Sequence, residues 1–194
     1  MLNEQEYKEL LPLLESLKEV CSGIATGSKE LKDRLITGVK EDLGHLFFFI
    51  RLLITKDFES NTGMNLDKWT EFADKLSERF EDILNAVQRT YNCCSASGFE
   101  KLDENLEQLE QVDNAFSSNY EDTIGPLIKL QKWLAEAPNK IKSAPRGFIG
   151  EAEKPVIIED SLKGADDLKK LIQALDEART RILTIKNFIK TSLT

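Results

Sequence analysis

His45 is the only histidine in the chain, and its neighbours decide whether it can act as a metal ligand. Asp42 stands three residues before it and Glu41 four, so only Asp42 has the spacing of an acid-x-x-His motif. Di-metal helical bundles need a Glu-x-x-His motif on each of two helices, and structural zinc sites need four nitrogen or sulfur ligands. We therefore interpret His45 as a packed or boundary histidine and predict no metal and no other cofactor.

The nucleophilic side chains also lack the partners that catalysis needs. A serine, threonine or cysteine would have to use His45 or a lysine as its base, and no Gly-x-Ser-x-Gly pattern surrounds any serine. The sequence has neither Gly-x-Gly-x-x-Gly nor the Walker pattern, so it indicates no nucleotide cradle. Cys93 and Cys94 are a candidate redox pair or acylation point, but no basic neighbour lowers a thiol pKa. We interpret them as incidental residues in a turn at a helix end, and we expect no enzymatic activity.

A polar segment that begins at position 57 carries alternating oxygen ligands, as a calcium-binding loop does. These ligands are Asp57, Glu59 and Asn61. A calcium loop needs glycine at its sixth position and a bidentate glutamate at its twelfth, whereas Gly63 is seventh here and Lys68 is twelfth. A divergent calcium site is the alternative. We prefer a polar turn in which Asn65 caps the helix that follows.

A basic and apolar cluster falls where proline and glycine are most frequent. Its members are Lys140, Lys142, Arg146, Phe148 and Ile149. Three positive charges beside two apolar side chains fit an acidic groove on another protein or an anionic membrane surface. The alternative is that Phe148 and Ile149 pack against the end of the fold while the bases are solvated.

A second candidate surface is acidic. Eight acidic residues and one lysine lie between Phe99 and Asp122, a balance of −7, whereas residues 161–194 have seven bases and four acids, a balance of +3. Three of the acids recur every third residue, which places them on neighbouring positions of a helix. They are Glu104, Glu107 and Glu110, which we call the acidic stripe. It is either a docking surface for a basic partner or a solvated face. The opposite charges favour the two segments as neighbours, although exposed ion pairs of ~0 to 1 kcal/mol are too weak to fix the topology.

Helices must position these residues, because apolar side chains recur every three and four positions between the few Gly and Pro residues. We expect helices over about residues 4–22, 28–56, 66–91, 99–117, 123–137 and 159–192. Turns at 23–27 and 57–65 separate the first three, and residues 139–157 form a long irregular connection before the last helix. Pro12 is expected to kink or split the first helix, which makes its first turns the least secure. The periodicity places Leu76 and Leu162 among the inward residues.

The expected fold is all-α, an up-and-down bundle of five to six helices with residues 1–194 as a single domain. Residues 46–54, LFFFIRLLI, are apolar most of the way round a helix, so we expect Phe47 to be central. The apolar run between Asp42 and Lys56 has 13 residues, including Arg51. A membrane span needs ~20, so we expect no transmembrane segment.

Composition and charge narrow the class of protein. A chain of 194 residues with 41% hydrophobic and 31% charged residues is globular in type rather than disordered. The 26 basic and 34 acidic residues give a net charge of −8, which disfavours nucleic acid as a partner. The acidic N-terminal segment has no signal-peptide features, and three cysteines form no paired framework, so we expect a cytoplasmic protein.

These features together predict a non-enzymatic helical interaction module, an adaptor, effector or regulatory subunit that binds a protein partner. Binding would use the acidic stripe or apolar side chains exposed near the ends of the first and last helices. The alternative is a membrane-acting bundle of the toxin or cell-death-effector kind, which would release residues 46–54 and a kinked first helix onto a membrane surface. A weaker third reading is a carrier that holds an apolar ligand between helices.

Overall fold

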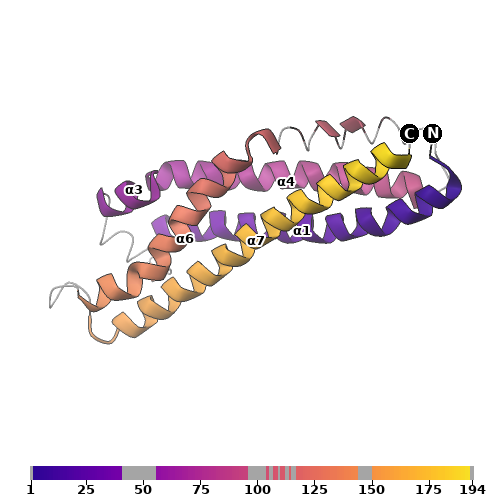
Figure 1. The fold of residues 1–194 in the computed structure, drawn as a ribbon. Coiled ribbons are helices and arrows are strands. Elements are labelled where there is room, and N and C mark those ends of the chain that lie inside the picture. The colour runs from indigo at the N-terminus through magenta and orange to yellow at the C-terminus, as the bar shows by residue number, and fades with distance from the viewer. Residues whose placement is uncertain are drawn as a thin grey trace. The chain divides into compact units, whose positions relative to one another are not determined.

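All regular secondary structure in the described part of the chain is helical. The computed structural model describes residues 2–40, 56–95, 104, 107–108, 110–111, 114, 117–143 and 150–192. Its helices are α1 (Glu4–Lys40), α3 (Lys56–Thr62), α4 (Leu66–Ser95), α6 (Tyr120–Lys142) and α7 (Lys154–Ser192), and no strand occurs in those ranges (Figure 1). This confirms the all-α prediction. The predicted count of five to six helices does not match exactly, because four long helices pack together in the described part of the chain and α3, with 7 residues, is a short addition.

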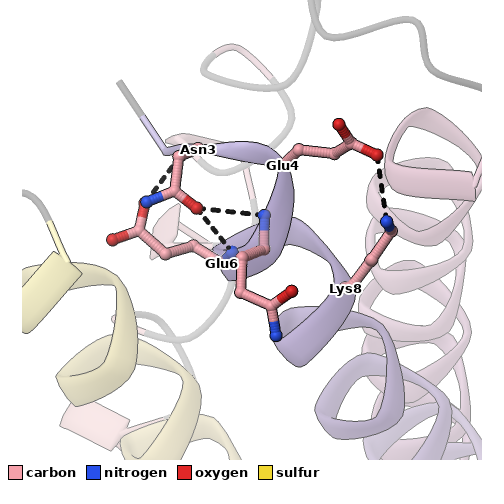
Figure 2. A network of polar contacts seen from close by, with 5 residues as sticks. Asn3, Glu4, Glu6 and Lys8 are labelled. Atoms are coloured by element: carbon pink, nitrogen blue, oxygen red, sulfur yellow. Dashed lines mark hydrogen bonds and ion pairs between the residues drawn. The ribbon is translucent and has the colours of Figure 1, made fainter.

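Capping side chains fix the beginning of α1 (Figure 2). Asn3 Oδ1 accepts hydrogen bonds from the backbone N–H groups of Gln5 and Glu6, both at 3.0 Å, and Glu6 Oε2 accepts one from Asn3 N at 2.6 Å. These reciprocal bonds form a capping box, and Leu2 and Tyr7, both buried, stand at the positions of a hydrophobic staple. These contacts stabilise the first turns of α1, and the expectation that they are the least secure part of the helix stays a prediction.

A continuous buried face carries α1 through the positions where we expected a kink and a turn. The helix has 37 residues and includes both Pro12 and the segment from Gly23 to Gly27. Its buried residues keep four- and three-residue spacing across that segment. They are Leu10, Leu14, Leu17, Cys21, Ile24 and Ser28. Packing of this face overrides the low helix propensity of glycine, so the predicted turn at 23–27 is wrong.

The connection between α3 and α4 has well-defined caps. Gly63 follows α3 with a φ of +84°, the left-handed conformation that favours glycine after a helix, and its N–H donates to the Glu59 carbonyl at 2.8 Å. Asn65 Oδ1 accepts a hydrogen bond from the Lys68 N–H at 2.9 Å, which confirms that Asn65 caps α4. The polar loop expected at 57–65 is helical as far as Thr62. The calcium reading does not fit, because it needs a ligand loop where α3 is helical.

The remaining helices exceed their predicted bounds. α6 begins at Tyr120 and runs through Pro126 and Pro138, because its buried face continues to Ile141. α7 begins at Lys154 instead of near 159, with Pro155 in its first turn, where a missing N–H costs no helical bond. Of the predicted connection over 139–157, only Ser143 and residues 150–153 are non-helical within the described part. α4 continues through Cys93 and Cys94 to Ser95, so these cysteines lie in its last turn and not in a loop.

The chain divides into two compact units. Unit 1 contains Met1–Thr26, Leu76–Tyr120 and Gln173–Thr194, and unit 2 contains Gly27–Lys75 and Glu121–Ile172. α1, α4 and α7 each contribute residues to both. The single-domain organisation of residues 1–194 stays a prediction.

Unit 1 is held by apolar faces of α1, α4 and α7. Its buried residues include Leu14, Leu17, Leu76, Phe80, Ile83, Val87, Leu175, Ala178 and Ile182. Complete burial of one large aliphatic or aromatic side chain contributes roughly 1.5–3 kcal/mol before the entropic cost of folding. Leu76, at 3% exposure, confirms its predicted inward position.

Unit 2 has an aromatic core in which the polar groups of Trp69 and Thr62 are paired. Phe58 and Trp133 meet edge to face with ring centroids 5.1 Å apart. The Trp69 indole N–H donates to Thr62 Oγ1 at 3.0 Å, and Thr62 Oγ1 in turn donates to the Phe58 carbonyl at 2.7 Å. This chain of bonds satisfies the buried indole and joins α4 to α3.

None of the helices in the described ranges contains a stretch with the length and apolar character needed to cross a bilayer. Two regions named in the sequence predictions, His45 and residues 46–54, lie outside the described residues. The central position expected for Phe47 and the membrane-acting alternative therefore stay predictions.

Candidate interaction surface

The acidic stripe is helical and exposed. Glu104, Glu107 and Glu110 all have helical backbone, and their side chains are open to solvent. The other described residues from 107 to 118 are also helical. Residues three apart are neighbours on a helix, so the three carboxylates present a local concentration of negative charge to solvent.

This segment lies beside α7 within unit 1. Asn114 Oδ1 accepts a hydrogen bond from Lys186 Nζ at 3.4 Å, and the Tyr120 hydroxyl donates to Asp176 Oδ1 at 3.0 Å. Residue numbers rise from 114 to 120 on one side while they fall from 186 to 176 on the other, so the two segments are antiparallel. The contacts confirm the expectation that the acidic segment and the last helix are neighbours.

Because the two segments are antiparallel, basic residues of α7 lie beside one end of the acidic stripe. Glu110 is one helical turn before Asn114, and Lys190 is one turn after Lys186, so the two residues occupy corresponding positions along the pair. Both side chains are exposed. The basic residues of α7 therefore offset part of the negative potential at this end of the stripe, while solvent screens the remainder.

A mixed aromatic and charged contact fixes the junction of this segment with α6. Tyr120 is 8% exposed, and the guanidinium carbon of Arg179 is 4.2 Å from the centre of its ring. Burial, followed by the hydrogen bond to Asp176 and that residue's negative charge, raises the pKa of Tyr120, while Arg179 opposes the shift. This contact was not predicted from the sequence. The Asp-x-x-Arg spacing on α7 was visible, but it does not reveal which aromatic residue it meets.

The basic cluster is described only in part. Lys140 and Lys142 lie in the last turn of α6, where positive charge favours the carboxyl end of the helix dipole. Lys142 is exposed, and Lys140 Nζ is 5.6 Å from the ring centroid of Trp133 in a cation–π arrangement. Arg146, Phe148 and Ile149 lie outside the described residues. Lys140 thus has a structural role within unit 2, and the cluster as a binding surface stays a prediction.

Several large apolar side chains are exposed. They are Ile128, Val156, Leu162 and Leu183. Leu162 is 50% exposed, so its predicted inward position is wrong. Leu183 is 47% exposed on the half of α7 that belongs to unit 1. Single exposed apolar residues are normal on protein surfaces, and these four do not define an apolar docking face.

The Cys21 thiol is buried and unreactive. Cys21 is a free cysteine, completely buried in unit 1, and burial raises its pKa from 9.0 to about 12. Because the thiolate is the nucleophile, this side chain is unreactive at neutral pH. In the part of the chain that the structure describes, no group of three or more His, Cys, Asp or Glu side chains is placed to hold a metal ion.

Comparison with known proteins assigns no family to the chain: no family model matches it, and no curated protein matches its sequence.

Proposed function

We propose that this protein is a non-enzymatic interaction module that binds a basic helical segment of a protein partner through the acidic stripe. The observation that carries the proposal is the exposure of Glu104, Glu107 and Glu110 on helical backbone. A net charge of −8 strengthens attraction for a basic partner and increases its rate of encounter.

The contact between Asn114 and Lys186 supports a helical occupant. Asn114, one turn after Glu110, already contacts one helix, α7, in which Lys186 and Lys190 are four residues apart. A partner helix with lysine or arginine at positions i and i+4 would present the same pattern to the carboxylates. The free, unpaired state of Cys21 supports a reducing compartment, so we propose the cytoplasm as the place of action.

Charge reversal on the stripe tests the proposal. A fluorescent amphipathic peptide with lysines at i and i+4 serves as the probe, and binding is followed by anisotropy at low and physiological salt. The triple variant Glu104→Lys, Glu107→Lys, Glu110→Lys should abolish binding. The matched control reverses three exposed acids on α4, Glu78→Lys, Glu81→Lys and Asp82→Lys, with the same change in net charge.

The two triple variants separate a site from bulk charge. If both triple variants weaken binding of the peptide equally, the attraction depends on net charge alone and the stripe is not a binding site. Affinity purification from cells, with chemical cross-linking to the stripe, then identifies the natural partner. Recovery of the same partners by the stripe variant and the unmodified protein would contradict the proposal.

A further inference from the structure

The segment from Gly23 to Ser28 is poorly suited to the interior of a 37-residue helix. Two of its six residues are glycines, Gly23 and Gly27, and Thr26 and Ser28 are also weaker helix formers than alanine. Glycine in a helix interior is often explained by a close approach of another element or by positive φ. Among the described glycines, positive φ occurs at Gly63, outside this helix.

Packing does not require either glycine of the segment. Apart from its chain neighbours and the backbone of its own helix, a Cβ at Gly23 would meet no atom of the described residues within 4 Å. A Cβ at Gly27 would lie 3.5 Å from Leu171 Cδ1, which is an ordinary van der Waals contact. Alanine would therefore fit at both positions and favour the helix, so the glycines weaken α1 without a compensating contact.

The hydroxyl of Ser28 adds a second cost to the closed helix. Its side chain is completely buried, and its Oγ has no hydrogen-bond partner among the residues that the structure describes. Ser161 provides the contrast within the same unit, since it is equally buried but donates to the Ile157 carbonyl at 2.8 Å. A buried hydroxyl without a partner has lost its bonds to water, and it regains them when the surrounding helix opens.

We infer that Gly23–Ser28 is a built-in opening point of α1. The helix is formed in the folded state and opens locally at this segment, without global unfolding, so that residues 4–22 and 29–40 become separate helical segments. The division between the two compact units also falls within the segment, between Thr26 and Gly27. This inference does not depend on the proposed function.

Amide hydrogen exchange of the full chain, followed by mass spectrometry, measures such opening directly. In the unmodified protein, amides of residues 23–32 should exchange at least about tenfold faster than those of residues 10–20, because they open in a separate step. Gly23→Ala should slow exchange of residues 23–32 by about two- to fivefold. Ser28→Ala should slow it at least about threefold, since it removes the unpartnered hydroxyl. Neither should change residues 10–20.

Two matched variants control for general stabilisation. Gly125→Ala alters a helical glycine at which an added Cβ would likewise meet no described residue beyond its own helix backbone within 4 Å, and Ser161→Ala removes a buried hydroxyl that is satisfied. Both should leave exchange of residues 23–32 unchanged. The proposal is overturned if residues 23–32 exchange in step with residues 10–20, or if Gly125→Ala slows them as much as Gly23→Ala does. Far-ultraviolet circular dichroism checks that each variant folds.

Discussion

The hydroxyl of Tyr120, the first residue of α6, donates a 3.0 Å hydrogen bond to Asp176 Oδ1 on α7. The two residues are 56 positions apart in the sequence. Because the phenol is mostly buried and Arg179 stacks on its ring, this bond fixes the acidic segment to α7 at one defined position. The alignment of the acidic stripe with the basic residues of α7 follows from it.

Removal of this hydroxyl should weaken unit 1. Tyr120→Phe keeps the ring and its contact with Arg179 but leaves Asp176 without its donor. We expect the free energy of unfolding at pH 7 to fall by about 0.5–1.5 kcal/mol, measured by urea denaturation. Tyr91→Phe is the control, because Tyr91 also lies beside a cation, Lys18, at 5.6 Å. A change of the same size in both variants would show that the bond to Asp176 contributes nothing specific.

The same tyrosine predicts a dependence on alkaline pH. The pKa of Tyr120 is raised in the folded protein above its ordinary value of 10.0. The neutral phenol therefore stabilises the fold fully below the unfolded pKa, and this contribution is lost as pH rises through the folded pKa. We expect the stability difference between the unmodified protein and Tyr120→Phe to shrink above about pH 10. A constant difference between pH 8 and 11 would contradict the raised pKa.

Two leucines at helical positions should differ sharply on truncation. Leu76 is 3% exposed and Leu162 is 50% exposed. Leu76→Ala should lower the free energy of unfolding by ~2–5 kcal/mol, because it removes buried methyl groups and leaves a cavity. Leu162→Ala should change it by less than about 0.5 kcal/mol. Equal losses of stability for the two variants, measured by thermal or urea unfolding, would show that Leu76 is not part of the interior.

The capping box should contribute more to the stability of α1 than the neighbouring ion pair between Glu4 and Lys8 does. Asn3→Ala removes the acceptor for two backbone N–H groups and should cost about 1 kcal/mol, with faster amide exchange over residues 5–8. Glu4→Ala removes an exposed carboxylate that lies 3.0 Å from Lys8 Nζ (Figure 2), and it should have a smaller effect. The cap would be unimportant if Glu4→Ala raised exchange as much as Asn3→Ala.

Cys21 should resist alkylation until the protein unfolds. A pKa of about 12 against 9.0 implies about a thousandfold less thiolate at pH 8 than in the unfolded chain. The test uses a Cys93→Ser, Cys94→Ser variant, in which Cys21 is the cysteine left to label. Iodoacetamide should label Cys21 in the folded variant at least about a thousandfold more slowly than Cys21 in the urea-unfolded variant. Rapid labelling under native conditions would show that Cys21 is accessible.

Local sequence signals were sufficient where a side chain acts on its own backbone. The Asn65 cap and the beginning of α4 at Leu66 were both predicted, because a cap and an amphipathic period are written within a few residues. The exposure of Glu104, Glu107 and Glu110 agrees with both readings that the sequence offered, a solvated face and a docking surface. Helical periodicity places acids on one side of a helix, but it does not show which residues or partner face them.

Tertiary packing decided the features that contradict local propensity. α1 passes through Gly23 and Gly27, and α6 through Pro126 and Pro138, because the buried faces on either side are continuous. The sequence by itself determined an all-helical protein with charge divided unequally between its segments. Only the tertiary structure decided which helices are unbroken and that Tyr120 meets Asp176. The physical reason is that helix propensity costs about 1 kcal/mol at a glycine, whereas burial of an apolar face yields several times more.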